Sequence, residues 1–373
     1  MKGRVLVLGR LRGRGAAALV VDGRLEDLLL DPGEGDPVPP AGSVLPARLD
    51  RPAAKTGGVF VRMDGGLTGF LRGGAGPEAG RAVPVQVIGH PEPGKAVPVT
   101  DRVLWKGRTV ILTPGAPGIN VSRRIGEPAE RERLASAIAA AAAAADAPGD
   151  WGWIARSAAD GADETAIGAE VRWLAARAQG LAGQGEPWLR DAVTTALAEW
   201  TDPRPGTIAA SRELSDRLRT SLIPEAFGDA ALAGRCEATA APFDHFGVEE
   251  ALAALEAPEA ALPSGGSLAI EPTRALVAVD VNTGERFSGG AAMTANLEAA
   301  RELPRQLRLR GLGGQIAVDF APVAKRDRRR LEDALKTAFR RDPVETSLAG
   351  WTPLGHFELS RKRERRPLVP LRP

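Results

Sequence analysis

The 373-residue sequence contains no tyrosine, one cysteine and three histidines. The single cysteine, Cys236, excludes an internal disulfide bond and any zinc site built from several cysteines of this chain. We expect its thiol to pack as a small buried apolar group. The histidines are His90, His245 and His356, which lack the spacing of metal ligands, so the sequence argues against a histidine metal centre.

Long apolar runs are also missing. No stretch of about 18 uncharged apolar residues occurs, so the sequence predicts no membrane-spanning helix. The opening segment, "MKGRVLVLGRLRGRG", carries arginines where a secretory signal peptide needs an uninterrupted apolar core. These two absences predict a cytoplasmic protein.

Lysine is scarce, with seven lysines beside 42 arginines, and the formal net charge is only +2. The two signs are nevertheless segregated along the chain. Residues 225–300 contain 12 Asp and Glu against 3 Arg, whereas residues 301–373 contain 18 Lys and Arg against 9 Asp and Glu. This asymmetry indicates a surface for a polyanion near the C-terminal end. A general compositional bias toward arginine is the alternative explanation.

Turn signals divide the first hundred residues. "RVLVLG" and "AAALVVDG" predict a hairpin within residues 1–35, and the Pro/Gly-rich "DPGEGDPVPPAGS" marks a boundary. Five short alternating runs follow, which predict a small β-barrel of the OB type. Phe60 and Phe70 fall on neighbouring strands and Lys95 opens the last one, a combination that such barrels use to hold single-stranded nucleic acid. The alternative, in which both rings fill the barrel, stays open.

Two later strands each end on an aspartate. "RALVAVDVNTG" ends at Asp280 and "GGQIAVDFAP" at Asp319, and a helical pattern between them predicts a strand–helix–strand unit with parallel strands. The apolar content of the first strand predicts burial on both faces. Both aspartates should lie side by side at the carboxyl ends, where a cation must offset their repulsion. Mg²⁺ fits, since one or two carboxylates suffice to hold it, and Asn282 could orient a ligand or a water. Turn or helix capping is the alternative for these aspartates.

Several motifs in fixed order resemble one known family. "VDVNTGERF", "NLEAARELPRQLRLRGLGGQIAVDF" and "LGHFELSRKRERRPL" are similar to the catalytic domain of the bacterial ribonuclease E/G family, and "GVFVRMDGGLTGFL", "INVSRRI" and "IARSAAD" extend the resemblance. The resemblance implies an α+β multidomain fold, in which an S1 (OB-type) barrel and a 5′-sensor are inserted into an RNase H-like subdomain. An α/β DNase I-like catalytic subdomain follows. The implied ranges are 1–35 and 184–246 for the RNase H-like part, 36–104 for the barrel, 105–183 for the sensor and 247–373 for the catalytic part.

The resemblance also implies roles for individual residues. Asp280 and Asp319 would bind the catalytic Mg²⁺, with Asn282 supporting Asp280 by a hydrogen bond. Phe60, Phe70 and Lys95 would hold single-stranded RNA. The pocket for a 5′-monophosphate would comprise Gly107, Ile111, Arg156 and Ser157, where the family usually has threonine at the last position. The implied function is a Mg²⁺-dependent endoribonuclease of RNA processing or decay that leaves 5′-phosphate and 3′-hydroxyl ends and favours 5′-monophosphorylated RNA. A non-catalytic or weakly active RNA-binding protein of the same fold is the alternative.

Some family features are missing from this sequence. The zinc-link, a CPxC element after the "SRKR" strand, and the small dimerisation domain behind it do not occur. We therefore expect no structural zinc, no zinc-linked dimer, and weak or absent oligomerisation. The loop between Asn282 and Asn296 is shorter than is usual in the family and has lost acidic residues, which leaves reduced activity open.

Overall fold

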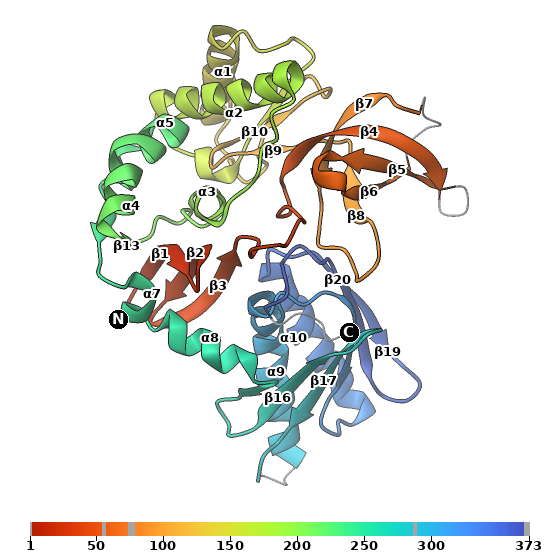
Figure 1. The fold of residues 1–373 in the computed structure, drawn as a ribbon. Coiled ribbons are helices and arrows are strands. Elements are labelled where there is room, and N and C mark those ends of the chain that lie inside the picture. The colour runs from red at the N-terminus through yellow and green to blue at the C-terminus, as the bar shows by residue number, and fades with distance from the viewer. Residues whose placement is uncertain (1, 54–56, 74–78, 286–288, 369–373) are drawn as a thin grey trace. The chain divides into compact units, whose positions relative to one another are not determined.

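A computed structural model of the protein describes residues 2–53, 57–73, 79–285 and 289–368 (Figure 1). The chain forms two compact units. The first comprises Met1–Arg24 with Leu29–Phe246, and the second comprises Leu25–Leu28 with Gly247–Pro373. None of the helices in the described ranges has the length and apolar character that crossing a bilayer requires.

The first unit contains a five-stranded sheet in the order β14-β13-β1-β2-β3. The predicted hairpin is formed by β1 (Arg4–Leu11) and β2 (Arg14–Val21), and β3 (Arg24–Leu30) adds a third strand. The strands β13 (Thr207–Ala210) and β14 (Cys236–Ala238) join in parallel from far along the sequence. Short helices pack with this sheet: α3 (Ala192–Glu199), α4 (Arg212–Arg217), α5 (Ile223–Phe227), α6 (Ala230–Ala233) and α7 (Pro242–His245).

The predicted barrel is present as a closed ring of five strands in the order β4-β5-β6-β8-β7. Its interior is filled by valine, leucine and methionine side chains from alternating strand positions, as barrel strands require. A parallel pairing of β6 with β8 and an antiparallel pairing of β7 with β4 close the ring. The strands are β4 (Val44–Ala53), β5 (Gly58–Met63), β6 (Thr68–Arg72), β7 (Ala82–Val87) and β8 (Val97–Thr100).

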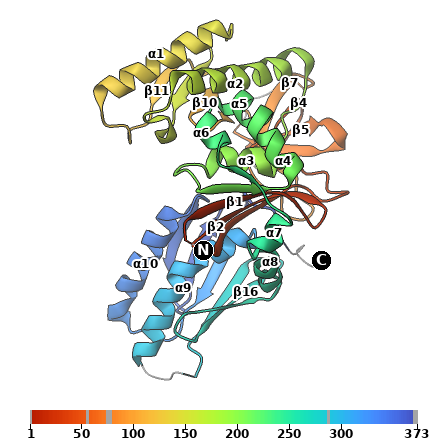
Figure 2. The same ribbon diagram turned by 90° about the vertical axis from the view of Figure 1, so that its left-hand side faces the viewer.

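A second small sheet of the first unit has the order β11-β12-β10-β9. Two helices, α1 (Pro128–Ala144) and α2 (Glu164–Gln184), lie side by side and pack on it (Figures 1 and 2). The face predicted for α2 is correct, because Ile167, Val171, Leu174 and Ala178 are all buried. The strands are β9 (Trp105–Lys106), β10 (Val110–Thr113), β11 (Gly118–Val121) and β12 (Gly152–Ala155).

The second unit is a six-stranded sheet in the order β15-β16-β17-β18-β20-β19. The predicted strand–helix–strand unit consists of β17 (Val277–Asn282), α9 (Gly289–Leu309) and β18 (Gly314–Asp319), with β17 and β18 parallel. In Figures 1 and 2, α9 and α10 (Arg328–Arg341) lie on the same face of the sheet. The remaining elements are α8 (Val248–Glu256), β15 (Glu259–Ala261), β16 (Ser267–Pro272), β19 (Thr346–Trp351) and β20 (Phe357–Arg361).

The two faces of the second unit's sheet differ, and here the expectation that β17 is buried on both faces is wrong. Val277, Val279 and Val281 point into the core formed with α9 and α10, whereas Asp280 and Asn282 are exposed. An alternation of period two is typical of a strand with one packed and one solvated face. Alanine at position 278, on the outer face, made the run look uniformly apolar in the sequence.

Candidate active site and binding surfaces

The two predicted carboxylates meet on the solvated face of the second unit's sheet. Asp280 and Asp319 are direct partners in the parallel β17–β18 pair. Adjacent strands lie about 4.8 Å apart, so the two carboxylates project from neighbouring positions in the same direction. Both side chains are exposed, Asp319 to 64%. The structure therefore brings together two acidic side chains that are separated by 39 positions in the sequence.

Neighbouring groups position these carboxylates. Asn282 donates a hydrogen bond from Nδ2 to Asp280 Oδ2 at 2.8 Å. On the helical side, Asn296 is fully buried in α9 and bonds Ala321 twice, by donating to its carbonyl at 2.8 Å and accepting from its amide at 3.0 Å. These two hydrogen bonds attach Ala321, two residues after Asp319, to α9. The loop from Asn282 to α9 contains residues 286–288, which lie outside the described residues.

His356 is a neighbour that the sequence interpretation missed. Its Nε2 lies 3.9 Å from Asp319 Oδ2. The register of β18 with β20 explains the proximity, because Val318 pairs with Phe357 and the next step along each strand leads to Asp319 and His356. The spacing of the three histidines argues against a histidine metal site, but strand pairing creates neighbours that spacing does not reveal.

The donor set of this site suits a hard cation that keeps most of its waters. Two exposed carboxylates and the amide oxygen of Asn282 are oxygen ligands, which match Mg²⁺ better than a metal that needs a closed protein cage. The His356 imidazole is a nitrogen donor beside them, 3.9 Å from Asp319. Among the described residues, no group of three or more His, Cys, Asp or Glu side chains is arranged to hold a metal ion. A metal held here would thus leave open positions for water and for a substrate oxygen.

The aromatic pair of the barrel lies outside its core. Phe60 and Phe70 face each other across β5 and β6, with ring centroids 5.6 Å apart in an edge-to-face arrangement. Both rings are half-buried and neither belongs to the barrel's buried cluster, so the interpretation in which they fill the barrel is wrong. Glycine at position 58 allows this packing, because a Cβ there would lie 2.5 Å from Phe70 Cζ.

One of the two nearby strand-end cations contacts the aromatic pair, and the structure shows no such contact for the other among the described residues. The Arg51 guanidinium lies 5.4 Å from the centroid of the Phe60 ring, a contact that the sequence interpretation did not anticipate. Lys95 precedes β8 and forms an ion pair with Glu92 at 2.5 Å. The Lys95 side chain is 66% exposed, so water screens this pair. The barrel surface therefore combines two half-buried rings with the positive charge of Arg51.

The residues expected to form a phosphate pocket are gathered at one end of the β10–β12 pair. Arg156 follows β12, its backbone amide donates to Thr109 O at 2.7 Å, and its Nη1 donates to Gly107 O. Ile111 is half-buried in β10, opposite Ile154 of β12. Ser157 begins a short 3₁₀ turn directly after Arg156. The fork of Arg156 also contacts Glu199 of α3, with Nη2 2.8 Å from Oε2.

A buried carboxylate holds the Gly107 loop in place. Glu170 of α2 accepts hydrogen bonds from the amides of Arg108, Thr109 and Val110 and from the Thr109 hydroxyl. Burial raises the pKa of Glu170 above its ordinary value, and the Thr109 and Arg108 bonds oppose that rise. A Cβ at position 107 would overlap the Glu170 carboxylate, so glycine is required there by packing. The Gly107 position is thus explained structurally, whatever ligand the pocket binds.

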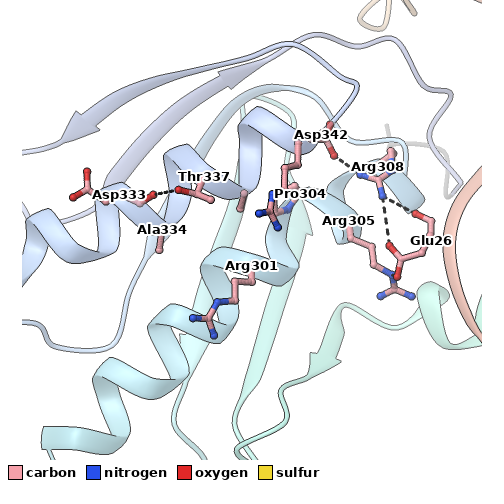
Figure 3. Close-up of a pocket in the computed structure, with 11 residues that line it drawn as sticks. Glu26, Arg301, Pro304, Arg305, Arg308, Asp333, Ala334, Thr337 and Asp342 are labelled. Carbon is pink, nitrogen blue, oxygen red and sulfur yellow. Dashed lines mark hydrogen bonds and ion pairs between the residues drawn. The ribbon is translucent and has the colours of Figure 1, made fainter. Parts of the chain in front are cut away.

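A separate hollow of about 640 Å³ lies between α9 and α10 (Figure 3). Two of its four lining arginines pair with acidic neighbours. Arg305 pairs with Glu302 at 2.6 Å, and Arg308 pairs with Asp342 and with Asp27. Asp342 also binds Arg361 at 2.8 Å, and both side chains are almost fully buried. Arg305, Arg308 and Arg361 are therefore engaged in ion pairs within the second unit and do not contribute to an open basic surface.

Comparison with known proteins identifies the family of the chain. The model of the ribonuclease E/G family matches residues 105–364. Ribonuclease G of Salmonella typhimurium and that of Escherichia coli K12 are each 31% identical over 300 residues, which cover 77% of this chain and 60% of the relative. Ribonuclease E of Nostoc sp. is 31% identical over 298 residues, which cover 75% of this chain and 42% of the relative. The chain thus spans about three fifths of the length of the ribonuclease G relatives that it matches.

Proposed function

This chain belongs to the ribonuclease E/G family, and from that premise we propose that it is a Mg²⁺-dependent endoribonuclease. The proposed reaction is hydrolysis of single-stranded RNA to 5′-phosphate and 3′-hydroxyl ends, in RNA processing or decay. The observation that carries the proposal is the registered, outward-facing pair of Asp280 and Asp319. Binding of RNA alone would not need two adjacent carboxylates, which repel a phosphate backbone.

The proposed chemistry assigns a role to each residue of the pair and to its neighbour. Asp280 and Asp319 would hold Mg²⁺, which would supply a Lewis acid for activating water and for offsetting the charge on the scissile phosphate. Asn282 fixes one oxygen of Asp280 through its 2.8 Å hydrogen bond, so the carboxylate is oriented before the ion arrives.

The barrel and the pocket beside Arg156 are the proposed RNA-binding surfaces. Phe60 and Phe70 stack on RNA bases, and Lys95 contacts the sugar-phosphate backbone of the RNA. Arg156 and Ser157 bind a 5′-monophosphate, with Gly107 and Ile111 closing the pocket. Since serine lacks the methyl group of threonine, we expect a preference for 5′-monophosphorylated RNA of about tenfold, the lower end for a charge-assisted hydrogen bond. The partition into RNase H-like, S1, 5′-sensor and DNase I-like parts is proposed with the same ranges.

The partners and location follow from this role. Single-stranded RNA is the proposed partner, and a function in processing or decay would place the protein in the cytoplasm with the transcripts. We propose no structural zinc and at most weak self-association.

Cleavage of a fluorescent single-stranded oligoribonucleotide tests the proposal. We expect internal cuts in Mg²⁺, none in EDTA, and none for Asp280→Asn or Asp319→Asn, while both variants retain RNA affinity. Asp333→Asn is the matched control, because Asp333 is an exposed side chain of α10, on the opposite side of the sheet. Wild-type rates in both site variants would refute the assignment. Tight RNA binding without cleavage by the wild type would favour the non-catalytic alternative.

A further inference from the structure

The guanidinium group of Arg156 already donates hydrogen bonds to protein acceptors. Beside the bond from Nη2 to Glu199 Oε2 at 2.8 Å, its Nη1 donates to the carbonyls of Gly107 and Ala198, the latter at 3.4 Å. Arg156 is 24% exposed and Glu199 29% exposed, so the pair is only partly open to water. A phosphate that binds Arg156 must share or displace these acceptors.

Glu199 is surrounded by positive charge. Its other oxygen, Oε1, lies 3.8 Å from Arg190 Nη2, and Arg190 is 8% exposed. Burial alone would raise the pKa of Glu199, but the charges of Arg156, Arg190 and Lys106 outweigh it and hold the pKa below its ordinary value. Glu199 is therefore ionised at neutral pH, and one carboxylate serves two guanidinium groups.

A carboxylate and a phosphate are alternative acceptors for the same guanidinium donors. A 5′-monophosphate carries a charge of about −1.5 to −2 at pH 7, so it is also repelled by the Glu199 charge. Because the pair is partly shielded from water, this repulsion is screened less than on an open surface. Both effects weaken the binding of a 5′-phosphate relative to a 5′-hydroxyl.

We infer that Glu199 is a specificity-determining residue, which limits recognition of the RNA 5′-phosphate by competing with it for Arg156. The inference rests on the proposed function, since it concerns the same pocket. It differs from a purely supporting role for Glu199, in which loss of the carboxylate would misplace Arg156 and weaken phosphate recognition. Loss of the Glu199 carboxylate should strengthen 5′-phosphate binding if Glu199 competes for Arg156, and weaken it if Glu199 only supports Arg156.

Binding measurements separate these roles without any cleavage. The probes are oligoribonucleotides of about ten nucleotides, labelled with fluorescein at the 3′ end and carrying either a 5′-monophosphate or a 5′-hydroxyl. Fluorescence anisotropy in EDTA gives the two dissociation constants. The dissociation constant for 5′-hydroxyl RNA divided by that for 5′-monophosphorylated RNA measures 5′-phosphate recognition. We expect Glu199→Gln, which keeps the side-chain shape but removes the charge, to raise this ratio about tenfold over wild type. A ratio within about twofold of wild type, or below it, would overturn the inference.

Controls tie the effect to Arg156. Glu213→Gln makes the same charge change at an exposed position of α4 and should leave the ratio at the wild-type value. Adding Arg156→Ala to Glu199→Gln should remove the gain. An equal rise in Glu213→Gln would point to net charge and count against Glu199. Circular dichroism checks the fold, and Glu199→Ala replaces the glutamine variant if that variant is unfolded.

Cleavage assays in Mg²⁺ provide the second readout. Glu199→Gln should cut 5′-monophosphorylated RNA faster than wild type does and 5′-hydroxyl RNA at the wild-type rate. An unchanged preference in an active enzyme would refute only the role of Glu199. Absence of any cleavage by the wild type would refute the proposed function and leave the anisotropy ratio as the test of Glu199.

Discussion

Phe60 and Phe70 face away from the barrel core, so their replacement tests RNA binding without creating a core cavity. We expect the double alanine variant to lose single-strand affinity, since stacking contributes about 1 to 3 kcal/mol per base. Titration with a fluorescent oligonucleotide measures the change, and thermal unfolding should show an intact barrel. An unchanged dissociation constant in the folded variant would remove the proposed role of the pair.

Cys236 illustrates how burial controls reactivity at a single residue. The thiol lies in the core of the first unit, as the sequence predicts for a lone cysteine, and burial raises its pKa to about 11. Its thiolate fraction at pH 8 is therefore very small. We expect a thiol-specific reagent to label the native protein far more slowly than the protein unfolded in urea. Equal labelling rates would mean that the site opens readily.

At the scale of helices and strands, local patterns predicted much of the structure. The five barrel strands, the buried face of α2 and the parallel β17–β18 pair follow from alternation, periodicity and turn residues. Contacts between distant elements were not predictable in this way. His356 reaches Asp319 through strand register, and Glu199 reaches Arg156 across 43 positions, with no local signal in either segment. Such pairs depend on tertiary packing, which a single sequence does not encode in its spacing.

The buried ion pairs between α9, α10 and β20 connect three elements of the second unit. Asp342 is fully buried and accepts bonds from Arg308 and from Arg361, itself only 1% exposed. We expect Asp342→Ala to lower the free energy of unfolding by about 3 to 5 kcal/mol, because it removes the carboxylate that pairs with the buried Arg361 and one of the acidic partners of Arg308. Urea denaturation measures the loss. Asp333→Ala, at an exposed position of α10, should change it by no more than about 0.5 kcal/mol.

At the scale of the whole molecule, metal content tests the absence of a zinc-linked assembly. A CPxC element contains two cysteines, and this sequence contains one cysteine, which is buried. We expect no stoichiometric zinc in elemental analysis and no stable tetramer in light scattering at low micromolar concentration. Stoichiometric zinc or a stable tetramer would contradict this expectation.

The alternation of β17 also constrains how the length of the chain can vary. Asp280 and Asn282 occupy one face of the strand, and Val279 and Val281 the other. Inserting or deleting one residue between the Thr273 turn and Asp280 would reverse this alternation. The carboxylate would then point into the core and the valines toward water. A two-residue change would restore the faces but move Asp280 out of register with Asp319. Length variation around this site is therefore confined to the loops that flank the strand.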